Sequence, residues 1–370
     1  MQGGYSRKRL LIIQGLKWMS FCLLIIYCAL WLINNQTKNV ARQPATTKVE
    51  LEPESKDDSV NQSATAIDSI INSVDKESAE NLITEEASEV LNTSDEHQFF
   101  CLDKDNNQEL VPVTHACTRI SNRLASISMA DCMDANLRLS QCHAVSGFPI
   151  LIREFAPLED KIPKARVLVI GGTHGDELTS VSVVFKWIET LNRHHSGLFH
   201  WRVVPMMNPD GVLKKEASRT NQNGVDLNRN LPTDDWQENA LKYWHQRKGG
   251  NPRRYPGEKA ASEPETQWLI DEINSFNPDA IISVHAPYGM VDFDSLLLNN
   301  APKSLGKLHL NMLGTYPGSL GNYAGINRNI PVVTLELPHA WVMPSNGEIT
   351  KIWEDIVSWL LNNFSSKDAE

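Results

Sequence analysis

The chain has 370 residues, of which 41% are hydrophobic and 22% are charged, and its formal net charge is −10. This length can bury one sizeable core, with room for a small extra module. The mildly acidic balance argues against nucleic acid as a partner, because binding to phosphates needs clustered Lys and Arg side chains. Composition indicates no oligomeric state.

Residues 1–35 are predicted to form a cytoplasmic tip and a single transmembrane anchor. The stretch 18–33 carries no charged residue, and Lys17 at its edge can reach the membrane interface. Basic residues at 7–9 place the N-terminal side in the cytoplasm. No small-x-small cleavage site follows the apolar run, which favours an uncleaved anchor over a cleaved signal peptide.

Residues 36–97 are predicted to be a disordered acidic linker, because they contain no aromatic residue and too little apolar surface to offset the entropy of ordering. Residues 98–147 are predicted to form a small pre-domain that carries four cysteines. Their even number outside the membrane favours two disulfides, in any of three pairings, over a zinc knuckle with irregular spacing. The cysteines are Cys101, Cys117, Cys132 and Cys142.

The body of the protein is expected at residues 148–364, followed by a tail at 365–370. Strand-like and helix-like patterns alternate along the body, which predicts an α/β sheet with helices on both faces. The expected strands are 166–170, 201–207, 280–284 and 331–337, and the expected helices are 179–191, 264–276 and 348–363.

Three residues suggest a metal site at one edge of this sheet. His174 and Glu177 follow the first strand of the body, and their spacing lets both side chains face one point at the start of a helix. His285 comes directly after the strand 280–284, so it projects at the same edge of the sheet. Imidazole nitrogens and a carboxylate are typical ligands of hydrolytic zinc. An H-x-x-E pair alone is weak evidence, since such pairs are common on surfaces.

Glu336 lies inside an apolar β-run, where a carboxylate is costly unless it is paired or functional. Near zinc it can take a proton from water and pass it to a leaving amine. An outward-facing strand residue is the alternative interpretation.

Arg219, Asn228 and Arg229 lie in a polar loop at 219–230. Guanidinium groups bind carboxylates bidentately and stabilise a developing oxyanion, which makes this loop a candidate substrate-binding element. An ordinary surface loop is the alternative.

Together these motifs resemble the carboxypeptidase A-like zinc peptidases over roughly residues 148–364. The matching features are H-x-x-E at His174–Glu177, the distant His285, G-V-D-x-N-R-N at 224–230 and T-x-E-L at 334–337. The resemblance implies a mixed, mostly parallel eight-stranded sheet with helices on both faces, and one zinc ion on His174, Glu177 and His285.

The same resemblance implies roles for the remaining candidates. Glu336 corresponds to the general base, and Arg219 to the residue that polarises the scissile carbonyl. Asn228 and Arg229 correspond to the clamp for the terminal carboxylate of the substrate. Tyr316, rather than Tyr323, is the expected match for a mobile tyrosine that caps the substrate.

A narrower resemblance is to the bacterial branch that cuts γ-D-glutamyl–diaminopimelate bonds in murein peptides. Digestive members of the family carry Arg where this chain has Asp176, and an anion there would suit a substrate with an extra amine. The motifs that carry this likeness are at 174–177, 283–287, 317–321 and 333–338.

These observations predict a membrane-anchored zinc metallopeptidase or amidase that hydrolyses a C-terminal amide bond of a cell-wall peptide. The expected location is the bacterial inner membrane, with a single pass and the catalytic domain in the periplasm. A general metallocarboxypeptidase is one alternative. An aspartoacylase-like deacylase is disfavoured by the long interval before His285, and a non-catalytic wall-binding module is disfavoured because ligands, base and arginines are all present.

Overall fold

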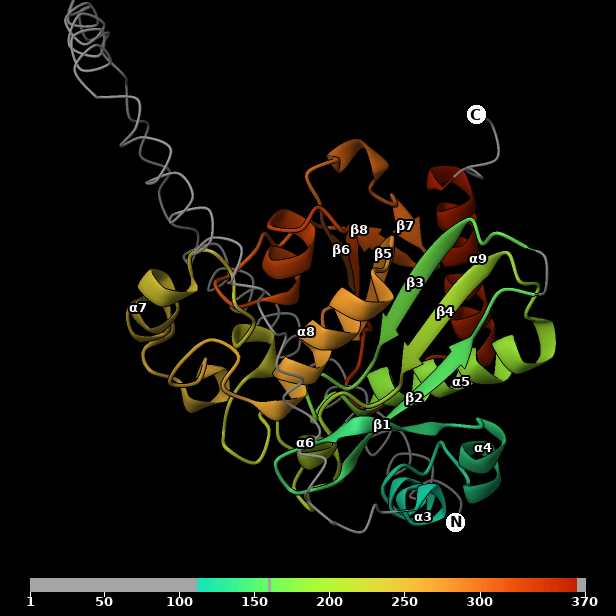
Figure 1. The fold of residues 1–370 in the computed structure, drawn as a ribbon, viewed down its shortest axis with the longest axis horizontal. Coiled ribbons are helices and arrows are strands. Elements are labelled where there is room, and N and C mark those ends of the chain that lie inside the picture. The colour runs from blue at the N-terminus through green and yellow to red at the C-terminus, as the bar shows by residue number, and fades with distance from the viewer. Residues whose placement is uncertain (1–111, 159–160, 365–370) are drawn as a thin grey trace, which may run out of the picture. The chain divides into compact units, whose positions relative to one another are not determined.

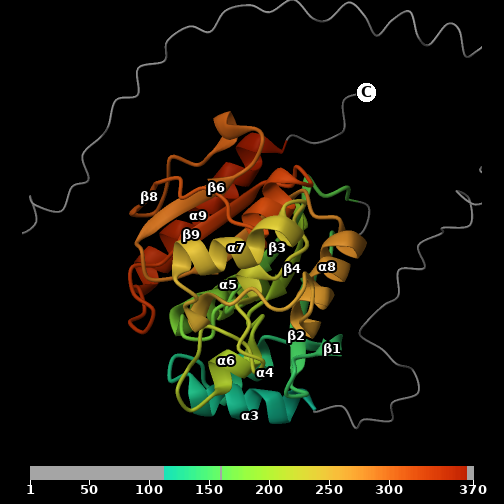
Figure 2. The ribbon, with the colours of Figure 1, turned by 90° about the vertical axis from the view of Figure 1, so that its left-hand side faces the viewer.

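The computed structural model describes residues 112–158 and 161–364 (Figures 1 and 2). The predictions for the anchor, the linker, Cys101 and the C-terminal tail lie outside the described residues. Within the described ranges, no helix is long and apolar enough to cross a membrane.

The described part of the chain contains a nine-stranded sheet in the order β1-β2-β4-β3-β5-β9-β6-β8-β7. The expected number was eight, so this expectation was wrong by one strand; the β7 edge strand has only two residues. The strands are β1 (Arg138–His143), β2 (Pro149–Phe155), β3 (Ala165–Ile170), β4 (Phe199–Val204), β5 (Ala280–His285), β6 (Met290–Asp294), β7 (Ser304–Leu305), β8 (Leu308–Leu310) and β9 (Val332–Glu336).

The sheet is mixed, as expected, but it is mostly parallel only at its centre. Strands β4, β3, β5 and β9 run parallel to one another, and β6 runs parallel to β8. The other four pairings are antiparallel: β1–β2, β2–β4, β6–β9 and β7–β8. Parallel neighbours need long crossover connections, whereas short loops such as the one between β1 and β2 produce antiparallel pairs.

Helices cover both faces of the sheet, which confirms the predicted layering (Figure 1). Alternate residues of β3 divide between two apolar clusters, because successive strand side chains point to opposite faces. Val167 and Val169 join the cluster that contains α5 and α9, and Leu168 and Ile170 join the one that contains α8. The helices are α3 (Val113–Arg123), α4 (Met129–Asp134), α5 (Leu178–His194), α6 (Pro209–Leu213), α7 (Trp236–Lys248), α8 (Pro264–Phe276) and α9 (Asn346–Asn363).

The described part of the expected pre-domain shares the core of the larger domain. Ala116 and Ile120 of α3 belong to the same apolar cluster as α5, and β1 pairs with β2. The predicted boundary between residues 147 and 148 therefore falls inside the β1–β2 hairpin. A disulfide joins Cys117 to Cys132 and links α3 to α4. Because Cys101 is not among the described residues, the second disulfide stays a prediction.

The loop after β3, which carries the first two candidate ligands, is held against α6 by close backbone contact. A Cβ added to Gly175 would overlap the backbone of Gly211. The buried Asn208 side chain reinforces this contact, since it donates to the carbonyl oxygens of Thr173 and Arg219 and accepts from the amide of Gly211. The ligand loop, α6 and the start of the 219–230 loop are thus joined through one side chain.

Gly175→Ala is expected to lower the free energy of unfolding by roughly 1–3 kcal/mol, because the new methyl group meets backbone atoms rather than a flexible side chain. Urea denaturation of the purified protein measures this change. Gly347→Ala is the matched control: nothing lies within 4 Å of the added Cβ, and the site is in α9. That variant should be neutral or slightly stabilising. Equal effects of the two substitutions would contradict the close-approach argument.

Candidate active site

Three candidate ligands meet at the carboxyl ends of the central parallel strands. His174 lies in the loop after β3, Glu177 precedes the first residue of α5, and His285 is the last residue of β5. All three side chains are buried, and one potential ligand atom from each lies within 4.8 Å of the others. The geometry therefore brings together the three residues that the sequence singled out.

The donor atoms of these residues face a single point. His174 Nδ1 lies 2.9 Å from Glu177 Oε1 and 3.0 Å from His285 Nδ1, and His285 Nδ1 lies 3.0 Å from Glu177 Oε2. Two imidazole nitrogens and a carboxylate are a donor set that suits zinc, with the rest of the coordination sphere left for water or substrate. These residues fit a catalytic metal.

Asp226 orients the first of these ligands. Its buried Oδ1 lies 3.2 Å from His174 Nε2, which leaves His174 Nδ1 as the atom that faces the other ligands. A carboxylate that accepts from the far nitrogen of a metal-binding histidine fixes the ring and raises its basicity. Burial disfavours the ionised form of Asp226, but the charges of Arg219 and His174 outweigh it and hold its pKa well below the usual range. Sequence reasoning assigned Asp226 no role.

Arg219 lies beside the metal ligands. Its Nε donates to Asp226 Oδ2 at 2.8 Å, and its Nη1 lies 3.5 Å from Glu177 Oε1. Burial disfavours its charge, but the carboxylates of Asp226 and Glu177 raise its pKa. Arg219 therefore presents a permanent positive charge next to the candidate metal centre.

Glu336 is the last residue of β9 and is in register with His285 on β5. Its side chain is buried, and its Oε2 receives no hydrogen bond from any described residue. Burial raises the pKa of Glu336 to about 7, and the Glu177 carboxylate adds to this shift. A carboxyl group with a pKa near neutrality can both accept and donate a proton at physiological pH. The outward-facing alternative does not hold for this residue.

A cavity of about 230 Å³ opens beside these residues. It is bounded by the sheet on one side and by the segment 313–321 on another. Its charged and polar lining residues are His174, Glu177, Arg219, Asn228, Arg229, Lys248, Arg254, Ser283, His285, Tyr288, Asp292, Asp294, Tyr316, Ser319, Thr334 and Glu336.

The predicted substrate clamp lies in this cavity. Arg229 is buried, its pKa is lowered by burial, and it forms no ion pair with any described residue. The ring of Tyr316 lies over its guanidinium, with the centroid 4.5 Å from Arg229 Cζ. Asn228 Oδ1 accepts from the amide of Leu320 at 2.8 Å. Arg229, Tyr316 and Asn228 are thus grouped as the sequence predicted.

Asp176 is placed differently from the other predicted site residues. Its Oδ2 pairs with Arg253 Nη2 at 2.7 Å, and Asp176 is not among the residues that line the cavity. Two other carboxylates, Asp292 and Asp294 of β6, do line it. Sequence reasoning missed both, because β6 was not among the expected strands: two charged residues interrupt its short apolar pattern.

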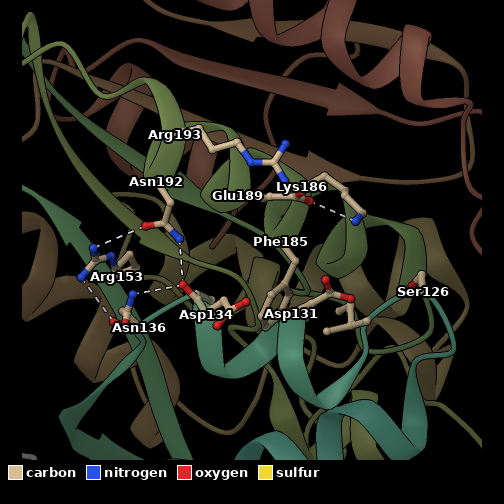
Figure 3. A pocket seen from close by; sticks show the side chains of 12 residues that line it. Ser126, Asp131, Asp134, Asn136, Arg153, Phe185, Lys186, Glu189, Asn192 and Arg193 are labelled. Atoms are coloured by element: carbon tan, nitrogen blue, oxygen red, sulfur yellow. Dashed lines mark hydrogen bonds and ion pairs between the residues drawn. The ribbon is translucent and has the colours of Figure 1, made fainter.

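A larger cavity, of about 510 Å³, lies away from the candidate ligands, between α4 and α5 (Figure 3). Its charged side chains largely neutralise one another: Lys186 and Arg193 both pair with Glu189. Its lining residues include no cluster of His, Cys, Asp and Glu side chains that could hold a metal ion. The smaller cavity is therefore the candidate active site.

Comparisons with known proteins agree with this geometry. The family model for zinc carboxypeptidase matches residues 137–293. Murein peptide amidase A of Vibrio campbellii is 32% identical over 202 residues, which cover 53% of this chain and 77% of the relative. The Escherichia coli protein of the same name is 37% identical over 131 residues, or 34% of this chain. That match spans only 50% of the length of the Escherichia coli relative.

Among solved structures, bovine thrombin-activatable fibrinolysis inhibitor in complex with tick carboxypeptidase inhibitor has the same fold. It aligns with a TM-score of 0.50 and 15% identity, covering 69% of this chain and 98% of that one. The fold, the His-Glu-His cluster and the sequence matches lead to one conclusion: the chain belongs to the zinc carboxypeptidase family.

Proposed function

We propose that this protein is a zinc-dependent amidase that removes the C-terminal residue of a murein peptide, by cutting the γ-D-glutamyl–diaminopimelate bond. One observation carries the proposal: a single cavity is lined by three candidate metal ligands, by Glu336, whose Oε2 has no hydrogen bond from the described residues, and by the buried Arg229, which forms no ion pair with them. The names of the relatives in Vibrio campbellii and Escherichia coli support the substrate class. We further propose a single-pass anchor in the bacterial inner membrane, with this domain in the periplasm.

Zinc held by His174, Glu177 and His285 would supply a Lewis acid that polarises a carbonyl group and makes water more acidic. Glu336 would take the proton from the attacking water and deliver it to the leaving nitrogen, for which a pKa of about 7 is suited. Arg219, fixed by Asp226, would stabilise negative charge on the carbonyl oxygen as it develops.

Arg229 and Asn228 would bind the terminal carboxylate of the substrate. Asn228 uses Oδ1 to accept from Leu320, and its Nδ2 donates to no acceptor among the described residues, so Nδ2 is available to the ligand. A buried guanidinium that lacks an anion is costly, and a carboxylate would satisfy it bidentately. The clamp therefore selects substrates with a free carboxylate beside the scissile bond.

The full-length chain, purified in detergent and loaded with zinc, is expected to release diaminopimelate from L-Ala-γ-D-Glu-meso-diaminopimelate. A chelator should abolish release, and added zinc should restore it. Liquid chromatography of the products measures both steps. No release at full zinc occupancy would overturn the substrate assignment, and equal turnover of ordinary peptides would instead identify a general carboxypeptidase.

Glu336→Gln is expected to lower kcat roughly 100- to 10,000-fold, because it removes the proton acceptor while keeping the shape of the side chain. Zinc content, measured by atomic absorption, should not change. Glu348→Gln is the matched control, because Glu348 lies at the start of α9, where it pairs with Lys307, and it does not line the cavity. A Glu336→Gln enzyme with normal kcat would exclude the general-base role.

Arg229→Ala is expected to raise KM roughly 10- to 100-fold for the tripeptide with a free terminal carboxylate, because it removes a hydrogen-bonded charge pair. The same peptide with an amidated terminus should bind weakly to the wild-type and variant proteins alike. Arg247→Ala, at an exposed position of α7, should leave the kinetics unchanged. If Arg229→Ala lowered kcat without changing KM, the clamp assignment would be wrong.

A further inference from the structure

Two cations that the proposed function does not use line the candidate active-site cavity. Lys248 is the last residue of α7, and Arg254 is the last residue of the short 3-10 helix Pro252–Arg254. Both side chains are half-buried, and neither forms an ion pair with any described residue. The other two cations of the cavity have partners or a role, since Arg219 pairs with two carboxylates and Arg229 is assigned to the terminal carboxylate of the substrate.

The sequence after α7 turns the chain back toward the cavity. Gly249 and Gly250 end the helix with positive φ angles of 61° and 66°, which a residue with a side chain rarely adopts. Asn251 Oδ1 then accepts from the amide of Arg253 at 3.0 Å and starts the 3-10 helix. The carbonyl oxygen of Asn251 accepts from Trp244 Nε1 at 2.7 Å, which ties this turn to α7. These contacts let residues 248 and 254 line one cavity.

The residues on both sides of Arg254 are fixed to the candidate metal site. Arg253 Nη2 pairs with Asp176 Oδ2 at 2.7 Å, and Asp176 lies in the loop that carries the first two candidate ligands. The carbonyl oxygen of Tyr255 accepts from the amide of Asp226 at 2.8 Å. Arg254 is therefore held at the cavity by its neighbours, and its guanidinium group is left to contact a ligand.

Aromatic rings hold Lys248 close to the predicted substrate clamp. Lys248 Nζ lies 5.4 Å from the ring centroid of Tyr243 and 5.6 Å from that of Tyr316, and the Tyr316 ring also contacts Arg229. Burial lowers the pKa of Arg229, and the positive charge of Arg254 adds to this shift. Three like charges are thus kept together in the free protein, and an anion bound among them would relieve their repulsion.

A single carboxylate does not satisfy all three cations, because it pairs bidentately with one guanidinium group. The γ-linked tripeptide of the proposed function carries further carboxylates. The α-carboxylate of its glutamyl residue is free, since the scissile bond is made by the side chain of that residue. Diaminopimelate also has a second carboxylate at its far end. An ordinary peptide with neutral side chains has neither group.

We propose that Lys248 and Arg254 bind a second carboxylate of the substrate, separate from the one bound by Arg229, and thereby select peptides with more than one carboxylate. This inference rests on the proposed function and deepens it. A guanidinium group offers paired donors and an ammonium group offers a compact charge on a flexible stem, so the two together accommodate an anion from different sides. Because both side chains are half-exposed, the selection should weaken as the ionic strength rises.

The test compares the tripeptide L-Ala-γ-D-Glu-meso-diaminopimelate with two analogues that each lack one carboxylate. In the first analogue an amide replaces the glutamyl α-carboxylate. The second analogue ends in L-lysine, which lacks only the distal carboxylate of diaminopimelate. The wild-type protein should show a lower kcat/KM for the analogue without the bound carboxylate, and this preference identifies which of the two carboxylates is bound.

Arg254→Gln and Lys248→Gln are each expected to lower kcat/KM for the parent tripeptide roughly 5- to 30-fold, mainly through KM. Turnover of the analogue that lacks the bound carboxylate should change less than about twofold, which also shows that the variants are folded. Arg247→Gln is the matched control, because Arg247 is exposed on α7 and does not line the cavity. It should affect none of the three peptides.

Calorimetric binding of the three peptides to the zinc-loaded full chain, in a Glu336→Gln background that prevents turnover, separates this inference from the proposed function. If the wild-type protein hydrolyses no peptide but Arg254→Gln abolishes a preference for one carboxylate, the proposed function fails and the inference stands. Equal binding of all three peptides, an equal loss of affinity for all three in the variants, or no binding at all overturns the inference. Hydrolysis of the parent tripeptide despite equal binding leaves the proposed function intact.

Discussion

The buried carboxylate of Asp226 is the interaction on which the rest of the site depends. It contacts His174 with one oxygen and Arg219 with the other, and it also accepts from the amide of Asn228. A buried anion is tolerated only when it is paired and hydrogen-bonded. The need of Asp226 for these contacts therefore holds its three partners in fixed positions. The candidate ligand His174, the adjacent Arg219 and the loop that carries the predicted substrate clamp are consequently one electrostatic unit.

The centre of the fold could be predicted from the sequence because its elements are regular. The helix Pro264–Phe276 has the predicted bounds, and the strand of residues 280–285 differs from its prediction by one residue. The strand expected at 201–207 instead ends at Val204, before Pro205, which has no N–H for the ladder. Strands β1, β2, β6, β7 and β8 were not among those expected. Strands β7 and β8 have only two and three residues, β1 is mostly polar, and two aspartates interrupt β6.

The contrast between the regular central strands and the short or polar outer strands also explains which site residues could be predicted. His174, His285 and Glu336 follow or end buried parallel strands, and the ends of such strands meet at one edge. Asp176 was chosen because digestive members of the family carry Arg at this position, but its carboxylate pairs with Arg253 and does not line the cavity. Asp294 lies on β6, a strand that was not expected from the sequence. Asp226 was overlooked because it acts by positioning His174 and Arg219.

Arg229 and Asp294 line one cavity with no counter-ion among the described residues. Each pays a desolvation cost in the free protein that a ligand of complementary charge would relieve. The two unpaired charges lower the stability of the free protein, and relief of this cost contributes to the affinity for the ligand. Other functional sites likewise oppose the most stable packing. Because a ligand that binds only the native state stabilises it by mass action, the free energy of unfolding would rise with the concentration of a ligand that carries both complementary charges.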